Sequence, residues 1–567
     1  MGNSRSAALP GSSPVPADVR FTDVNACEPQ TGPGISRVPP ASPSAISARW
    51  VSRLLAAFLL LGVAVRLNRY LLCFPLWGDE ACLAANFINR GYAELLRPLD
   101  YYPVAPVGFL WLIKTVVNVL GFNEYTLRLL PAICGLLSVP IFYLAARKML
   151  SGVPLLLSTG IFAVAYYPIR HGAEIKQYSS DLFVSLVLLW LALGYLARPR
   201  GGSRFWLLCL FVPPAIAVSH PAVFVAGGIA AVLLYRAVRI GGPAERKRFL
   251  VYCLLLLGSF AFVYLVFIRP YLRFELEVLD GRHMFTLWAR TFPPLDNLGR
   301  FLIWMIRTHT GRMFAYPAGA ENGGSILTFI FFLAGMAALR RRKDRQLFCL
   351  FIAPFVLAFA AAALRRYPYG YSARWMLYLA PFICLPAGLG ADRQLSRIGS
   401  PRRRKAAAYS VVAGLALIGA GTIVRDLVKP YKTRADWNSR EFARSFWGQS
   451  PEAGGLFCLK SDLGEDLFPG LFVTNHNAAR YLCNREICYP ARARRSFEEV
   501  EREWGAGSVF NLVVYSVPEH PRDEKRFREL LAKLETRAEL SDCRTWEVNL
   551  DFPIHREKYE VYKFTSR

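Results

Sequence analysis

Long apolar runs separated by short polar segments dominate the chain from about residue 50 to residue 425. A helix that crosses a membrane needs roughly 20 mostly apolar residues, with about 17 to 25 tolerated. We predict a membrane-spanning helix at each of eleven such runs. These runs lie near residues 52–73, 127–146, 152–168, 180–197, 205–219, 221–235, 249–268, 324–339, 346–364, 372–390 and 406–424.

One further apolar segment, from Pro106 to Leu120, is predicted to remain on one side of the membrane. A proline and Gly121 bound it, and Lys114 interrupts it. An amphipathic segment that is too short to cross is stable at the interface. We therefore predict an interfacial helix along the outer leaflet.

The two ends of the chain differ from this apolar region. Residues 1–48 are rich in Pro, Ser, Gly and Ala without hydrophobic periodicity, which predicts a disordered cytoplasmic tail. The tail lacks the compact regions of a cleaved signal peptide, so the first helix is expected to stay in the mature protein. Residues 425–567 are polar and alternate between strand-like and helical patterns. The strand-like runs are 456–460, 510–517, 546–550 and 560–564, and the helical runs are 497–504 and 524–539.

The predicted fold is thus an α-helical polytopic membrane bundle over residues 49–424, followed by a small α/β extramembrane domain over residues 425–567. Basic residues cluster on alternate loops, and Lys and Arg are retained on the cytoplasmic side. The clusters are 147–148, 198–204, 236–248, 340–345 and 393–405. This pattern predicts a cytoplasmic N-terminus and a C-terminal domain outside.

Composition supports a membrane protein and argues against two other classes. Apolar residues make up 54% of the chain, and the net charge of +27 is spread over loops rather than gathered in a stripe, which argues against a nucleic-acid partner. The twelve cysteines show no CxxC pair, so no zinc site is predicted. Four cysteines of the outer domain predict one or two disulfides, with Cys483 and Cys488 the nearest pair and the pairing left open; the other two are Cys458 and Cys543.

Candidate chemistry begins directly after the first apolar run, at Trp77-Gly78-Asp79-Glu80. Two carboxylates at a membrane surface can supply a general base. The alternative is that Asp79 merely caps the helical run from Glu80 to Asn89.

A second polar stretch runs from Arg170 to Asp181 between two apolar runs and contains Glu174, Lys176 and Tyr178. Charges at a membrane boundary tend to face a bundle interior or an aqueous cavity and to mark a substrate path. The alternative is a loop of cations and aromatics that reach the lipid headgroups.

Several further cations depart from the positive-inside pattern. Arg66 and Arg69 lie near the outer end of the first predicted span, and Arg365, Arg366 and Arg374 flank another outer boundary. An anionic ligand such as a lipid phosphate would need such partners. Retention by anionic headgroups is the alternative.

At these residues the chain resembles glycosyltransferases of the GT-C class, which include protein O-mannosyltransferases and the aminoarabinose transferases acting on lipid A. The resemblance covers residues 50–240 well and is one of general topology from there to residue 425. The residues that carry it are an Arg-bearing first span and the segments 77–81, 102–108, 121–124, 128–131 and 174–178.

The resemblance implies transfer of a sugar from a polyprenyl-phosphate donor to a lipid, glycan or protein acceptor, in a multi-pass protein of a bacterial plasma (inner) membrane. Asp79 matches the acidic position that the family uses as its base, and Glu80 would orient it or cap the loop. Candidate donor-binding residues are Lys176, Arg170, Arg374, Arg66, Glu174 and Tyr178. No cofactor is firmly implied; some related enzymes use a divalent metal, but the sequence has no clear carboxylate cage for one.

Two other functions fit parts of the sequence. A transporter or flippase of lipid-linked sugars would also need many spans and outer cations, but such proteins often contain internal repeats, and none is detected here. A receptor or assembly scaffold would account for the outer domain and leave the acidic and basic outer loops unexplained.

Overall fold

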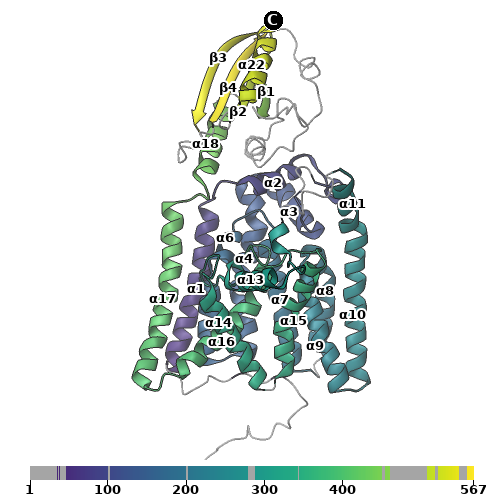
Figure 1. The fold of residues 1–567 in the computed structure, drawn as a ribbon, viewed down its shortest axis with the longest axis vertical. Coiled ribbons are helices and arrows are strands. Elements are labelled where there is room, and N and C mark those ends of the chain that lie inside the picture. The colour runs from purple at the N-terminus through teal and green to yellow at the C-terminus, as the bar shows by residue number, and fades with distance from the viewer. Residues whose placement is uncertain are drawn as a thin grey trace, which may run out of the picture.

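The computed structural model describes residues 35, 38, 46–99, 103–199, 202–278, 288–342, 344–449, 454–459, 507–516, 521–547 and 558–567. Figure 1 shows a bundle of long helices with a small sheet beyond one end. We call that end of the bundle the sheet end. Most of the predicted disordered tail lies outside the described residues. Ile35 and Val38 bond through their backbone N–H groups to the carbonyls of Leu196 and Met149.

Among the described residues, seven helical segments are long and apolar enough to cross a membrane, which makes the chain an integral membrane protein. They are α1 (Ala48–Leu71), α4 (Glu124–Met149), α7 (Tyr178–Ala197), α9 (Ala222–Arg239), the continuous run Pro243–Arg273 formed by α10 (Pro243–Val263), η2 (Tyr264–Ile268) and the start of α11 (Arg269–Val278), α15 (Arg345–Ala363), and α17 (Pro401–Val428). Helix α7 is the most buried of the seven and lies in the interior of the bundle.

The prediction of eleven spans is not confirmed. The other four predicted runs are helical but shorter, in α5 (Gly152–Ala163), α8 (Gly202–Val218), α14 (Ile326–Arg341) and α16 (Ala380–Ser396). The run 152–168 shows why, because its helix ends at Ala163 although apolar residues continue. The carbonyls of Phe162 and Ala163 accept hydrogen bonds from the guanidinium of Arg66. The hydropathy of a segment indicates only whether its side chains prefer lipid to water. It therefore cannot predict that a helix ends where a distant side chain bonds to its last carbonyls.

Short helices lie between the long ones. They include α2 (Gly78–Asn89), η1 (Glu94–Leu96), α3 (Val107–Leu120), α6 (Tyr166–His171), η3 (Ala289–Thr291), α13 (Leu298–Thr310), η4 (Arg312–Phe314) and η5 (Leu377–Leu379). Figure 1 shows α2 and α3 at the sheet end of the bundle and α13 about midway along it. Leu83 and Phe87 of α2 pack with Phe109 and Ile113 of α3 and with Ile175 in a core of their own. Helix α3 matches the predicted interfacial helix, and its position along the outer leaflet stays a prediction. This second core fixes α2 against the loop that follows α6.

The C-terminal part is an α/β unit, as predicted. It contains α18 (Arg434–Gln449), β1 (Gly454–Leu459), β2 (Val509–Ser516), α22 (Pro521–Glu535), β3 (Ala538–Glu547) and β4 (Lys558–Ser566). The strands form one sheet in the order β1-β2-β4-β3, with β1 parallel to β2 and the other pairs antiparallel.

Two predicted boundaries in this unit are wrong. The helix predicted to reach Glu539 ends at Glu535, and the strand predicted over 546–550 is β3, which begins at Ala538. Most side chains of β3 are exposed, so the strand has no alternating apolar pattern in the sequence, and pairing with β4 defines it instead. The predicted helix 497–504 and the cysteines 483 and 488 lie outside the described residues. Cys543 is a free, exposed thiol on β3.

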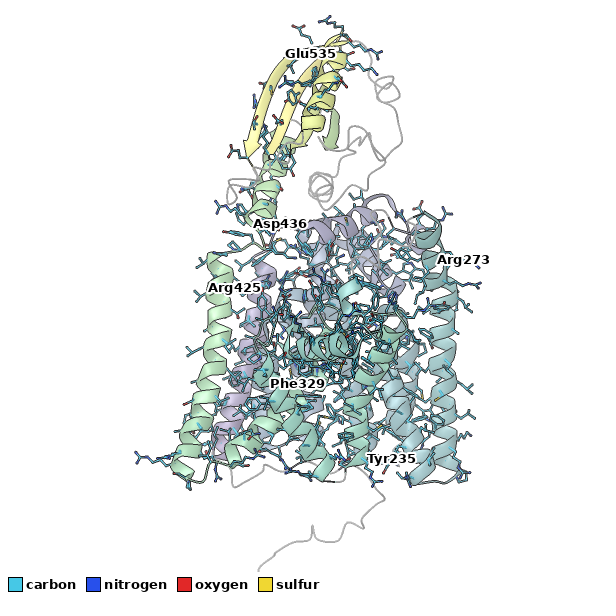
Figure 2. The ribbon with its side chains drawn as sticks, viewed as in Figure 1. Tyr235, Arg273, Phe329, Arg425, Asp436 and Glu535 are labelled. Carbon is cyan, nitrogen blue, oxygen red and sulfur yellow. The ribbon has the colours of Figure 1, made fainter. Side chains whose placement is uncertain are left out.

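The basic loop between α9 and α10 and the C-terminal unit lie at opposite ends of the molecule. Tyr235, one residue before Arg236, lies at the end away from the sheet, whereas Asp436 and Glu535 lie on the other side (Figure 2). The predicted topology also puts this loop and the C-terminal domain on opposite sides of the membrane; which side is cytoplasmic stays a prediction.

We predict that a membrane-impermeant maleimide added to intact cells labels the exposed thiol of Cys543. The reason is the basic loop at the opposite end, which the positive-inside rule assigns to the cytoplasm. Labelling would be measured by mass spectrometry of the peptide that contains Cys543, with Cys543→Ser as the control. Modification of this peptide only after the cells are permeabilised would reverse the topology and place the candidate site on the cytoplasmic face.

Candidate active site

The first turn of α2 presents Asp79 and Glu80 to different surroundings. The helix begins at Gly78 after an extended Trp77, so both carboxylates lie at its N-terminus, where the helix dipole favours negative charge. The side chain of Asp79 is 35% exposed, and that of Glu80 is 2% exposed. Only Asp79 can therefore meet a ligand without rearrangement of the core.

Glu80 is held in a buried ion pair with Arg128 of α4. Its two carboxylate oxygens accept hydrogen bonds of 3.1 to 3.2 Å from Nε and Nη2 of Arg128. Glu80 Oε1 also accepts the backbone N–H of Ile175 at 2.8 Å. Burial raises the pKa of Glu80, whereas Arg128 and the Ile175 N–H act in the opposite direction. Glu80 thus joins three segments of the chain, and its contacts are those of a structural residue.

Asp79 pairs with Arg374, which lies in the segment before η5. Arg374 Nη1 donates to Asp79 Oδ2 at 2.9 Å. The guanidinium carbon of Arg374 also lies 5.8 Å from the ring centroid of Trp77 and 5.1 Å from that of Trp375. Burial alone would lower the pKa of Arg374, but Tyr178, Asp79 and Glu174 raise it. Arg374, a predicted donor-binding residue, thus lies beside the predicted base, and its role in donor binding stays a prediction.

The loop after α6 brings a third carboxylate to the same region. Glu174 accepts hydrogen bonds from Arg170 Nε at 3.1 Å and from His171 Nδ1 at 2.7 Å. Burial alone would raise the pKa of Glu174, but His171, Arg170 and Lys432 hold it well below its ordinary value. Burial lowers the pKa of His171, so a neutral ring donates to an ionised Glu174. Glu174 therefore neutralises part of the positive charge at the site.

Three more of the predicted donor-binding residues are buried: Lys176, Arg66 and Tyr178. Lys176 is buried, and its ammonium has no partner among the described residues, since Glu174 pairs with Arg170 and His171. Arg66 donates to the carbonyl of Gly62 in its own helix and to those of Phe162 and Ala163 at the end of α5. Tyr178 is buried at the start of α7, with its ring centroid 5.2 Å from that of His171.

Two cations of the site, Arg128 and Lys432, do not stand out in the sequence as functional residues. Arg128 lies inside the segment 128–131 that carries the resemblance, and its role as the partner of Glu80 follows only from the packing of α4 on α2. Lys432 lies between α17 and α18, with Nζ 2.8 Å from the ring centroid of Trp77. Burial lowers the pKa of Lys432 to about 8, with Glu174 opposing this shift. Nothing in the local sequence around Lys432 distinguishes it from Lys429.

The arrangement is suited to an anionic ligand that reacts beside a carboxylate. Arg374 pairs with the partly exposed Asp79, Arg170 pairs with the buried Glu174, and Lys432 lies over the ring of Trp77, two residues before Asp79. Within the described parts of the chain, no three His, Cys, Asp or Glu side chains gather as ligands for a metal ion. Each site carboxylate instead faces a cation, which is a poor setting for a divalent metal.

The sequence matches no protein-family profile and no curated protein, but solved structures share its fold. ArnT from Cupriavidus metallidurans bound to undecaprenyl phosphate is 13% identical with a TM-score of 0.52, covering 91% of this chain and 98% of ArnT. ArnT from the same organism in the apo state is 12% identical with a TM-score of 0.51, covering 90% of this chain and 98% of ArnT. The archaeal oligosaccharyltransferase AglB from Archaeoglobus fulgidus, in complex with an inhibitory peptide and a dolichol-phosphate, is 14% identical with a TM-score of 0.48, covering 83% of this chain and 69% of AglB. The chain therefore has the fold of ArnT, a GT-C aminoarabinose transferase, as its sequence predicts.

Proposed function

We propose that the chain is a membrane glycosyltransferase that moves a sugar from a polyprenyl-phosphate donor to an acceptor hydroxyl on the non-cytoplasmic face. The observation that carries this proposal is the partly exposed Asp79 beside Arg374, with Lys432 on the ring of Trp77 two residues before it. ArnT, which has the same fold, has been solved with undecaprenyl phosphate, and this supports the donor class. The acceptor class is a lipid, a glycan or a protein that carries a free hydroxyl.

The proposed chemistry needs one base and several cations. The acceptor oxygen attacks the anomeric carbon of the donor sugar, and the bond from that carbon to the phosphate oxygen breaks. The hydroxyl proton passes to Asp79, and the phosphate departs on its polyprenyl chain with one more negative charge. Because a phosphate is already a good leaving group, cations that stabilise the departing charge replace a general acid. A single displacement of this kind inverts the anomeric configuration.

The remaining roles are proposed from the contacts of each residue. Arg374 touches Asp79 and is the cation best placed to bind a phosphate next to the base. Arg170 and Lys176 supply further positive charge, and Glu174 orients Arg170. Tyr178 lies near Arg374 and Asp79 and is proposed to contact the donor sugar. Glu80 holds the first turn of α2, which bears the base, through its pair with Arg128. Arg66 is left out of the site because its guanidinium donates to backbone carbonyls of α1 and α5. No step is assigned to a metal, because the described carboxylates face cations.

The test is a transfer assay with purified protein in nanodiscs. A panel of polyprenyl-phosphate sugars would be incubated with hydroxyl acceptors of each class, and release of polyprenyl phosphate would be followed by mass spectrometry. We expect release from at least one donor, and a product of inverted anomeric configuration by NMR. Asp79→Asn protein is the control for contaminating transferases.

A transporter or flippase of lipid-linked sugars would give a different result. It would move an intact fluorescent donor across proteoliposomes without releasing polyprenyl phosphate, and Asp79→Asn would leave that movement unchanged. This combination of results would contradict the proposed transferase.

A further inference from the structure

A lysine from outside the bundle reaches the candidate active site. Helix α17 ends at Val428 and α18 begins at Arg434, so Lys432 belongs to the short linker that leads to the C-terminal unit. Lys432 is half-buried, and its Nζ lies 2.8 Å from the ring centroid of Trp77. Trp77 immediately precedes α2 and therefore lies two residues from the proposed base, Asp79.

Ion pairs fix this linker at both of its ends. Before it, Asp426 of α17 accepts two hydrogen bonds of 2.8 Å from Arg69 of α1. After it, Arg440 of α18 donates to the carbonyl of Cys73 at 2.6 Å, and Arg444 pairs with Glu124 at 3.1 Å. Figure 2 shows Arg425, the neighbour of Asp426, and Asp436 of α18 at the sheet end of the bundle. The linker thus has little freedom to carry Lys432 away from Trp77.

The surroundings of Lys432 leave its charge available to a ligand. Glu174, Glu80 and Asp436 attract it, and Arg170 repels it. Its direct contact is with the indole of Trp77, and a cation–π contact attracts a cation without neutralising it. The guanidinium of Arg374 lies 5.8 Å from the same ring centroid. Two cations that come from distant parts of the chain therefore flank one indole next to Asp79.

We infer that Lys432 binds the phosphate of the polyprenyl-phosphate donor together with Arg374, so that the linker to the C-terminal unit completes the donor site. The inference rests on the proposed function and adds a residue and a role for the C-terminal unit to it. The alternative is that Lys432 serves only to dock the linker onto Trp77 and the nearby carboxylates.

The inference leads to a pH dependence of a defined sign. Burial lowers the pKa of Lys432 to about 8, with Glu174, Glu80 and Asp436 opposing this shift and Arg170 adding to it. In the protein without bound donor, Lys432 therefore loses its proton as the pH rises through about 8. Across this range a phosphate monoester keeps its charge, because its second pKa is near 6. His171 stays neutral and Arg374 stays charged, since their pKa values are lowered and raised, respectively. Affinity for the phosphate should be highest below pH 8 and fall above it.

The experiment measures binding of a polyprenyl monophosphate, and of the matching polyprenol without phosphate, to full-length protein in nanodiscs at pH 7 and pH 9. Lys432→Met is expected to weaken phosphate binding about tenfold to a hundredfold at pH 7, the usual effect of a lost hydrogen bond to a charged group, and to leave polyprenol binding unchanged. Lys432→Arg should keep the affinity and lose the decline between the two pH values, because Arg stays charged. Lys429→Met, an exposed lysine of the same linker, is the matched control and should bind as wild type does.

The outcomes separate this inference from the proposed function. If wild type binds the phosphate and Lys432→Met binds it equally well with the same pH profile, Lys432 is only a docking residue and the inference is overturned. If wild type itself does not distinguish the phosphate from the polyprenol, both the donor class and the role of Lys432 are wrong. Melting temperatures of the three variants show whether a loss of affinity comes from unfolding; rescue by Lys432→Arg supports the inference even if Lys432→Met is less stable.

Discussion

Asp79→Asn protein is expected to transfer sugar about 10²- to 10⁴-fold more slowly than wild type, which is the usual contribution of a general base. The substitution keeps the shape of the side chain and removes its basic lone pair. Asp79 is partly exposed and has Arg374 as its partner, whereas Glu80 and Glu174 are buried against their own cations. The measurement is the transfer rate with a donor that wild type accepts, together with the affinity for polyprenyl phosphate.

Two comparisons make this result interpretable. Asp296→Asn removes the same charge from an exposed carboxylate that pairs with Arg300 on α13, and it should leave the rate unchanged. Glu80→Gln should reduce the rate less than Asp79→Asn, because Glu80 supports α2 and does not reach the ligand. Near-wild-type turnover in well-folded Asp79→Asn protein would remove Asp79 as the base and make Glu174 the next residue to test.

Arg128→Met is expected to lower the free energy of unfolding by about 3–5 kcal/mol, because removal of one partner leaves the other charge buried and unpaired. Arg128 and Glu80 are each 2% exposed, and Arg128 also donates to the carbonyl of Phe74. The measurement is unfolding of purified protein by titration with a denaturing detergent, followed by tryptophan fluorescence.

The double variant Glu80→Leu/Arg128→Met separates the charge effect from the loss of packing. It should be more stable than Arg128→Met alone, since no unpaired charge remains, although the Ile175 N–H loses its acceptor. Arg300→Met on the exposed pair with Asp296 is the control and should change stability by less than about 1 kcal/mol. Equal stability of Arg128→Met and wild type would show that the pair does not hold α2 in place.

Most of the helices could be predicted from the chain alone, but several of their ends could not. Each predicted apolar run falls on a helix, because long apolar stretches can only bury their backbone polar groups in lipid as helices. The end of α5 at Ala163 depends instead on Arg66, which is almost 100 residues away and donates to the last carbonyls. In β3, the exposed side chains leave no alternating pattern, so the strand is visible only through its pairing with β4.

The candidate site divides in the same way. Trp77, Asp79 and the polar stretch 170–181 stand out in the sequence because charges follow directly after apolar runs, where they are costly and therefore informative. The partners of these residues do not stand out. Lys176, Arg374 and Arg66 are all candidate phosphate partners in the sequence. The structure brings Arg374 to Asp79, leaves the Lys176 ammonium without a partner among the described residues and pairs Arg66 with backbone carbonyls of α1 and α5.

Hydropathy and charge act locally along the chain, so they were enough to predict a helical membrane protein with an α/β C-terminal unit and with acidic residues at the start of its first polar loop. The folded molecule was needed to show that Asp79 is the accessible carboxylate, that Glu80 is held by Arg128, and that Lys432 reaches Trp77. These contacts join residues up to several hundred positions apart. They depend on how α2, α4, η5 and α18 pack together. This packing cannot be predicted from the residues that flank each contacting side chain in the sequence.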